Sequence, residues 1–339
     1  MGSGLPKSNH TGRHEPKVVY TGSRGILFQG DCLALLEHIV PRSIDLVFAD
    51  PPFNLGKAYE TEAFSDNLQI EEYRRWCHNW LDKLIECLKP GGSFFLYHWP
   101  KWLIEFGNWL NSDSRLEYRS WIAVKMKSGF PIRNRLHPAH YGLLYYTKVG
   151  ARPTFNVVRQ KSPVCRHCGR EVRDYGGYRD KFKKYEDGDG IPWVQIADFW
   201  EDTHPARQDK SRNNRIAELP LHIPERAILL ASRPGDIVLD VFGGSGSTYH
   251  AAQLHERLWI GCEIADTTPI LRRIKTVFGL ELDGDTNQSL LNCFGADFIN
   301  PKLESFRKYR RVSLQKVRQF EDKPDSFNEL ASKSKVLGY

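Results

Sequence analysis

Six mainly apolar residues, 44–49, lead directly into the segment Asp50-Pro51-Pro52-Phe53-Asn54-Leu55-Gly56. A run of this length and composition is typical of a buried β-strand, and two consecutive prolines end it in a tight turn. The sequence therefore predicts an acid at the end of a strand, in a turn whose backbone is restrained by its prolines.

A second predicted strand breaks into glycines almost two hundred positions later, within residues 238–248. It is apolar up to Asp240, and Gly243, Gly244 and Gly246 then precede a segment of helical composition. Such a loop between a strand and a helix lets the backbone approach a bound cofactor closely. The chain therefore has the proline-restrained turn first and a candidate cofactor loop second.

The remaining pattern predicts an α/β fold, with a doubly wound, mainly parallel sheet and helices on both faces. The motif Lys89-Pro90-Gly91-Gly92 is expected to end one long helix. Strands are predicted at 25–30, 44–49, 93–97, 118–124, 140–147, 237–241 and 258–263, and helices at 32–39, 70–88, 101–110, 224–232, 247–255 and 269–278.

The pattern changes between residues 126 and 215, where regular spacing fades. The segment from Lys148 to Lys184 contains eleven basic residues and only three acidic ones, and aromatic residues are interleaved with them. A solvated loop region can have this composition, but basic side chains with interspersed rings also suit a surface that holds phosphates and stacks on bases. We interpret 126–215 as a nucleic-acid-binding insertion that interrupts the α/β domain.

The composition agrees with this interpretation. Lys and Arg number 48 against 41 Asp and Glu, which gives a formal charge of +7 and suits a polyanionic partner. The sequence contains no apolar run near the ~20 residues that span a bilayer, and the glycine-rich start has no apolar signal segment. Seven cysteines do not form a disulfide framework, so we expect a cytoplasmic protein. Residues 1–20 are expected to be a disordered lead-in and residues 301–339 a basic tail.

The turn at Asp50 has the chemistry to hold an exocyclic amine of a nucleobase. Such a nitrogen is a poor nucleophile because its lone pair is delocalised into the ring. A carboxylate and a backbone carbonyl can each accept one of its N–H bonds, and proline offers no competing donor. The ring of Phe53 can stack on a base swung out of the duplex. Asp-Pro-Pro also occurs in ordinary loops, but the continuation Phe-Asn-Leu-Gly favours the functional interpretation.

Two further acids complete a candidate cofactor pocket. Glu263 ends the predicted strand 258–263, where a carboxylate can accept hydrogen bonds from both hydroxyls of a ribose. Asp31, in Gly30-Asp31-Cys32, offers another turn beside the sheet, although by itself it is typical of a helix cap. A glycine loop alone would also suit nicotinamide or flavin, but this one lacks the G-x-G-x-x-G form.

With these residues in place, the chain resembles the β class of DNA amino-methyltransferases. In that class the Asp-Pro-Pro-aromatic motif comes first, the target-recognition region second and the glycine-rich cofactor motif last. The resemblance covers about residues 25–278 and implies a Rossmann-like methyltransferase fold, S-adenosylmethionine as cofactor and double-stranded DNA as substrate. It divides the chain into a catalytic domain, 21–125 and 216–300, and a target-recognition insertion, 126–215.

The resemblance also implies a role for each matching residue. Asp50, Pro51 and Phe53 would hold the flipped base, and the Asp that opens this motif favours N6 of adenine over N4 of cytosine. The segment His222-Ile223-Pro224-Glu225-Arg226 departs from the family's His-Pro-Thr-x-Lys-Pro, so it receives no role. The cofactor pocket would be lined by Asp31, Asp50, Asp240, Phe242, Gly243, Gly244, Gly246, Thr248 and Glu263.

Relatives in this class are often dimers, and some act beside a separately encoded restriction nuclease; both arrangements stay open for this chain. Within enzymes, N4 of cytosine, an RNA base or a protein glutamine amide are alternative acceptors. A non-catalytic DNA-binding protein on a methyltransferase fold is the alternative outside enzymes. The intact turn and glycine loop favour the enzyme.

Cys165 and Cys168 have the C-x-x-C spacing of half a zinc knuckle. A second pair at suitable spacing is missing, because His204 and His222 are distant from it and from each other. We expect a reduced cysteine pair in a turn and assign no metal site; methyl transfer itself needs none.

Overall fold

The computed structural model describes residues 15–56, 66–126, 133–134, 136–165, 167–173, 177–186, 188, 190–201 and 218–278. The predicted tail, 301–339, and most of the predicted lead-in lie outside the described residues, as do Lys57 and His204. The predicted end of the lead-in at residue 20 is wrong. Residues up to Thr21 form strand β1 (Lys17–Thr21), because their backbone pairs antiparallel with β2 (Gly25–Gln29).

The described strands of the main sheet follow the order β1-β2-β11-β10-β3-β4-β6-β5-β9. Its centre is parallel and consists of β2, β11 (Leu258–Glu263), β10 (Ile237–Asp240), β3 (Ile44–Ala49) and β4 (Leu88–His98). On one side β6 (His140–Lys148) runs antiparallel to both β4 and β5 (Leu116–Lys125), and β9 (Phe199–Trp200) adds to β5 in parallel.

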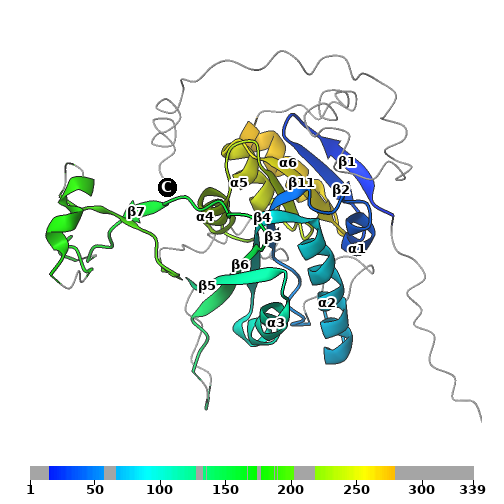
Figure 1. Cartoon of the computed structure of the whole chain (residues 1–339), viewed down its shortest axis with the longest axis horizontal. Helices are drawn as coiled ribbons and strands as arrows, with labels where there is room; N and C mark the ends of the chain where they lie inside the picture. Colours follow the sequence, from blue (N-terminus) through cyan, green and yellow to red (C-terminus); the bar gives the residue numbers. More distant parts are fainter. Residues whose placement is uncertain are drawn as a thin grey trace, which may run out of the picture.

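Helices cover both faces of this sheet, so the predicted doubly wound, mainly parallel α/β fold is confirmed (Figure 1). One face carries α1 (Cys32–Leu36), α2 (Ile70–Cys87) and α3 (Pro100–Ser112). The other carries α4 (His222–Ala231), α5 (Ser247–Leu254) and α6 (Thr268–Phe278). Among the described residues, none of these helices has the length and apolarity needed to cross a membrane.

Strand β3 shows why the central strands are apolar throughout. Val47 and Ala49 belong to the core beneath α1, α2 and α3, whereas Leu46 and Phe48 belong to the core beneath α4, α5 and α6. A parallel strand with helices on both sides has no solvent-facing side, so alternation of polar and apolar residues is lost. The predicted strand before Asp50 is confirmed at its predicted bounds.

Two predicted boundaries change in the structure. Lys89-Pro90-Gly91-Gly92, expected only to end a helix, is already part of β4, whose first residue follows Cys87 directly. The insertion boundary at residue 126 is wrong because β6 lies beyond it and pairs with core strands on both sides. The chain therefore remains part of the main sheet up to Lys148.

The described part of the inserted region forms a small lobe that projects away from the sheet (Figure 1). Strands β7 (Arg159–Lys161) and β8 (Trp193–Gln195) pair antiparallel, and the 3₁₀ helix η1 (Arg179–Tyr185) lies between them in the chain. Arg159 lies over the ring of Tyr185, 4.4 Å from its centroid. Lys181 lies over Tyr178, 4.3 Å from the centroid. Cationic groups and aromatic rings are thus interleaved in space as well as in sequence.

Lys148 does not belong to this basic surface, although its charge contributes to the basic stretch in the sequence. Its side chain is buried, and Nζ donates to the carbonyls of Ile85 (2.6 Å), Leu88 (2.8 Å) and Glu86 (3.2 Å). These are carbonyls at the C-terminal end of α2, where intrahelical donors run out. Lys148 therefore stabilises the end of a helix in the core.

Candidate active site

The predicted site residues meet at the carboxyl edge of the sheet. From β10 the chain continues to β11 on one side, and from β3 it continues to β4 on the other, so the winding direction changes between β10 and β3. Leu239 pairs with Val47, which places Asp240 and Asp50 at neighbouring strand ends. Loops that leave such a switch point in opposite directions form a crevice between them.

Hydrogen bonds fix the turn after β3 along most of its length. The carboxylate of Asp66 accepts the N–H groups of Asn54 (2.8 Å) and Leu55 (3.1 Å), and the Asp66 carbonyl accepts the N–H of Gly56 (2.7 Å). Asn54 has a φ of 55°, and its side-chain amide pairs with the backbone of Leu68 at 2.9 and 2.7 Å. The turn is therefore held by the segment that contains Asp66 and Leu68.

Two aromatic side chains hold carbonyls of the same turn. The Tyr73 hydroxyl donates to the Pro52 carbonyl at 2.5 Å, and the indole N–H of Trp102 donates to the Phe53 carbonyl at 3.1 Å. Within the part of the chain that the structure describes, no hydrogen bond to the Pro51 carbonyl is formed.

The Phe53 ring lies among other rings at the ends of β4 and β6. It stacks on His98 with the centroids 4.4 Å apart, and the rings of Tyr97 and Tyr141 are 6.2 and 5.7 Å away. Burial raises the pKa of both tyrosines, and the nearby charge of Asp50 raises it further. The structure therefore brings the predicted catalytic residues Asp50, Pro51 and Phe53 together beside a tyrosine-lined wall.

The glycine loop after β10 packs tightly against β11 and α5. The Gly243 N–H donates to the Cys262 carbonyl at 2.8 Å, and a Cβ on Gly243 would lie 2.8 Å from the Tyr249 hydroxyl. Gly246 precedes α5 with a φ of 80°. Gly244 also has a positive φ, 50°, but a Cβ there would meet no atom closer than 4.0 Å. One side of the loop is thus packed, and the peptide at Gly244 borders open space.

Glu263 joins the glycine loop to the end of β11. One carboxylate oxygen accepts the Gly244 N–H at 2.7 Å, and the other accepts the Ala265 N–H at 2.8 Å. Burial raises the pKa of Glu263, although these N–H groups oppose the effect. The Glu263 carbonyl also accepts the Gly30 N–H at 3.0 Å, which brings the turn that contains Asp31 to the same strand end.

Asp31 acts as the N-terminal cap of α1 in this structure. Its Oδ1 accepts the N–H groups of Leu33 (2.7 Å) and Ala34 (3.1 Å). The cap interpretation of the sequence is therefore confirmed, and a contact between Asp31 and the cofactor stays a prediction.

Asp240 supports the glycine loop from below. Its side chain is buried, accepts the Phe242 N–H at 2.9 Å and is hydrogen-bonded by the side chain of Thr248. Burial raises the pKa of Asp240 to about 7, and the charge of Glu263 adds to the effect. The geometry shows a loop-holding role for Asp240 and Thr248; their contact with the cofactor stays a prediction.

An aromatic wall on α2 connects the two halves of the site. Phe242 makes edge contacts with Trp80 (5.0 Å) and Trp76 (5.9 Å), and Trp76 lies 5.8 Å from Tyr73, which holds the Asp50 turn. The helical spacing of these residues in the sequence indicated a core helix and nothing more. Asp66, His98 and Trp102 were also missed, because the sequence carries no local motif that joins them to Asp50.

Cys165 and Cys168 lie in a tight turn of the projecting lobe. The Cys165 carbonyl accepts the Gly169 N–H at 2.9 Å, and backbone N–H groups of Cys168 and His167 lower the pKa of the Cys165 thiol. Across the described residues, no group of three or more His, Cys, Asp or Glu side chains could hold a metal ion.

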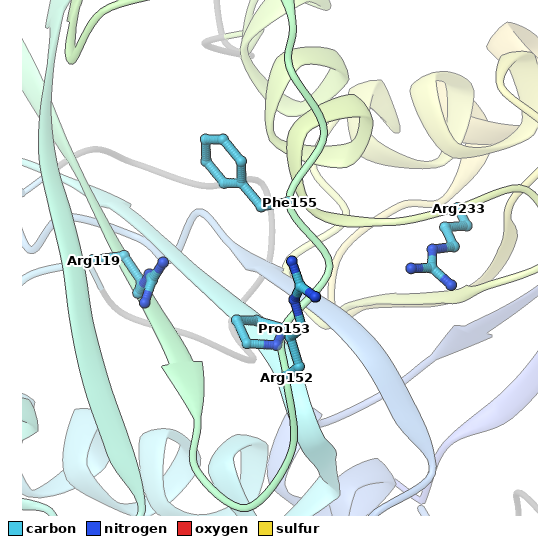
Figure 2. Close-up of a pocket in the computed structure, with 5 residues that line it drawn as sticks. All are labelled: Arg119, Arg152, Pro153, Phe155 and Arg233. Carbon is cyan, nitrogen blue, oxygen red and sulfur yellow. The ribbon is translucent and has the colours of Figure 1, made fainter.

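A cavity of about 660 Å³ opens at the opposite, amino edge of the parallel strands (Figure 2). Arg119 comes from β5, Arg152 and Phe155 follow β6, and Arg233 precedes β10; Pro153 completes the lining. Three guanidinium groups give this cavity a positive charge. Asp50 lies at the other end of the parallel strands, beyond the carboxyl end of β3. The cavity therefore lies apart from the Asp50 turn and the glycine loop.

Comparison with known proteins shows a family to which the chain belongs. Residues 44–268 match the model of a DNA methylase family. Type II methyltransferase M.BamHI of Bacillus amyloliquefaciens is 42% identical over 261 residues, which span 77% of this chain and 59% of that protein. Type II methyltransferase M.HpaI of Haemophilus parainfluenzae is 29% identical over 238 residues, 70% of this chain and 69% of that protein.

The fold is also similar to that of the solved structure of PvuII DNA methyltransferase (cytosine-N4-specific). The TM-score is 0.51 at 20% sequence identity, and the match covers 83% of this chain and 95% of the other. At this identity the likeness concerns the fold, which it supports over most of both chains.

Proposed function

This chain belongs to the DNA methylase family, and from that premise we propose that it transfers the methyl group of S-adenosylmethionine to an exocyclic amine of a base in double-stranded DNA. The observation that carries this proposal is the pairing of β3 with β10, because it sets the Asp50 turn and the glycine loop at neighbouring strand ends. An amine bound at the Asp50 turn and a cofactor bound at the glycine loop would occupy neighbouring strand ends. Their reacting atoms could then approach each other without movement of the sheet.

The residues around the crevice fit S-adenosylmethionine. When bound, this cofactor supplies a methyl group activated by a positively charged sulfur. The Glu263 oxygens each accept one backbone N–H, which leaves lone pairs for the two ribose hydroxyls. The open side of Gly244 lets the backbone approach the ligand, and the partly exposed Phe242 and Trp76 offer apolar surface to the adenine ring.

The catalytic turn would act mainly by positioning. Asp50 and the Pro51 carbonyl can each accept one N–H of the amine, and this holds the nitrogen lone pair toward the methyl group. When bound, the cofactor would give up its methyl group to the nitrogen as the carbon–sulfur bond breaks, and Asp50 could accept the proton that the nitrogen loses. Orienting two reactants in this way can supply several kcal/mol of the barrier reduction, about 7–11 in the best intramolecular cases.

A base must leave the duplex to reach this turn. One face of Phe53 is covered by His98, so the base would stack on the opposite face. Tyr97 and Tyr141 border the same space and restrict how the base can turn.

We infer N6 of adenine as the acceptor because Asp opens the motif, as the resemblance implies. The alternative is N4 of cytosine, and the family covers both chemistries. The two amines have the same hydrogen-bonding needs, so Asp50 and the Pro51 carbonyl would serve either one.

The projecting lobe would contact the DNA and select the sequence. Its lysines and arginines suit phosphates, and Tyr178 and Trp193 are exposed. By analogy with the Type II methyltransferases that it resembles, the protein would protect sites that a separately encoded nuclease cuts, in the cytoplasm, as a monomer or a homodimer.

The test is to incubate the purified protein with labelled S-adenosylmethionine and unmethylated genomic DNA, and to identify the labelled nucleoside after digestion. Labelled N6-methyldeoxyadenosine supports the full proposal. Labelled N4-methyldeoxycytidine would support methyl transfer to DNA but show that the acceptor is cytosine and not adenine. The Asp50→Ala variant should keep its fold but transfer no methyl. Cofactor binding without labelled DNA would favour an RNA or protein acceptor, and absence of cofactor binding would favour a non-catalytic DNA-binding protein.

A further inference from the structure

Tyr73 and His98 form a buried chain of hydrogen bonds that ends on the catalytic turn. The Trp99 N–H donates to His98 Nδ1 at 2.7 Å, so in the neutral ring the proton is on Nε2. His98 Nε2 is 2.7 Å from the Tyr73 hydroxyl and therefore donates to it. The Tyr73 hydroxyl uses its own proton for the Pro52 carbonyl at 2.5 Å. The three hydrogen bonds thus run in one direction, from Trp99 through His98 and Tyr73 to Pro52.

Both side chains are anchored in rigid elements. Tyr73 on α2 and His98 at the end of β4 are each 0% exposed. The Tyr73 ring packs on Trp102 at 4.7 Å, and the His98 ring packs under Phe53 at 4.4 Å. Burial lowers the pKa of His98 to about 3, so the ring is neutral at physiological pH and the bonds keep their direction.

The catalytic turn needs this support because its prolines leave one torsion angle unrestrained. A proline ring restrains φ, but ψ still decides where the carbonyl points and where the next residue begins. Fixing the Pro52 carbonyl therefore sets the direction in which Phe53 leaves the turn. The same bond keeps the Tyr73 hydroxyl occupied, so it does not compete for the Pro51 carbonyl.

We propose that Tyr73 and His98 are positioning residues for methyl transfer, which orient the Pro52 carbonyl and so hold the Phe53 ring and the Pro51 carbonyl where the amine binds. Neither side chain contacts the substrate in this arrangement. The effect on rate rests on the proposed function, whereas the effect on the turn does not.

The first variant is Tyr73→Phe, which removes one hydroxyl and keeps the ring that packs in the core. Tyr146→Phe is the matched control, because Tyr146 is equally buried and its hydroxyl donates to Asn111 at 2.8 Å, on α3 and away from the turn. Misplacement of reacting groups by about 1 Å can cost on the order of 100-fold in rate. We expect Tyr73→Phe to lower the single-turnover rate of methyl transfer about 10- to 100-fold, with little change in the affinities for cofactor and DNA. Tyr146→Phe should keep the rate.

A second pair of variants tests His98. The amide of glutamine can still donate toward Tyr73, so His98→Gln should retain more of the rate than His98→Leu. An equal loss of rate in both variants would indicate that His98 contributes only by packing and not by its hydrogen bond to Tyr73.

Amide hydrogen exchange measures how often the backbone of the turn opens, and this measurement does not depend on what the protein methylates. Tyr73→Phe should speed exchange in peptides that cover residues 50–56, and Tyr146→Phe should not. Unchanged exchange and an unchanged rate in Tyr73→Phe would overturn the inference, as would equal effects of the two tyrosine variants. If Tyr73→Phe speeds exchange but the wild-type protein transfers no methyl to DNA, the role of Tyr73 in holding the turn stands and the proposed function is rejected.

Discussion

Replacing Asp240 with asparagine should stabilise the ligand-free protein, and the gain should grow with pH. Burial raises the pKa of Asp240 from 3.8 to about 7. An acid with a higher pKa in the folded than in the unfolded state lowers stability as pH rises above the unfolded value, and the loss is complete above the folded value. A pKa difference of about 3 corresponds to about 4 kcal/mol. Asparagine keeps an acceptor for the Phe242 N–H and can donate to Thr248, so the shape of the loop is preserved.

Urea unfolding of both proteins at several pH values measures this effect. The difference in unfolding free energy should rise from under ~2 kcal/mol at pH 5 to about 4 kcal/mol at pH 8.5. Glu263 and the other titrating groups remain in both proteins, so their contributions largely cancel in the difference. A difference that does not depend on pH, or a variant that is less stable at pH 8.5, would refute the reasoning.

Three further substitutions test separate parts of the structure. Lys148→Met should lower the unfolding free energy by about 2 kcal/mol, because three carbonyls at the end of α2 lose a charged donor, while cofactor affinity measured by calorimetry should not change. Gly243→Ala should cost about 1–3 kcal/mol of stability, because its Cβ would lie 2.8 Å from the Tyr249 hydroxyl; an unchanged melting temperature would argue against this packing. Phe53→Ala should leave cofactor affinity intact but weaken binding of the flipped base by about 1–3 kcal/mol, which the fluorescence of 2-aminopurine at the target position reports.

Local patterns in the sequence determined the strand before Asp50, the glycine loop after Asp240 and the alternation of strands and helices. These features depend on neighbouring residues: an apolar run, a pair of prolines, glycines that meet a strand end. The catalytic and cofactor motifs could therefore be recognised before their places in the sheet were known. The Asp50 turn and the glycine loop lie close together because β3 pairs with β10, and local sequence patterns do not predict which strands pair.

Tertiary structure alone decided which residues support the turn and which basic residues face solvent. Asp66, Tyr73, His98 and Trp102 reach the turn from other elements, and Tyr73 and His98 are 25 positions apart. Lys148 has the charge of a DNA-binding residue, but pairing of β6 with β4 and β5 buries it against the end of α2. Composition records charge and size, whereas burial and hydrogen-bond partners depend on which distant segments the fold brings into contact.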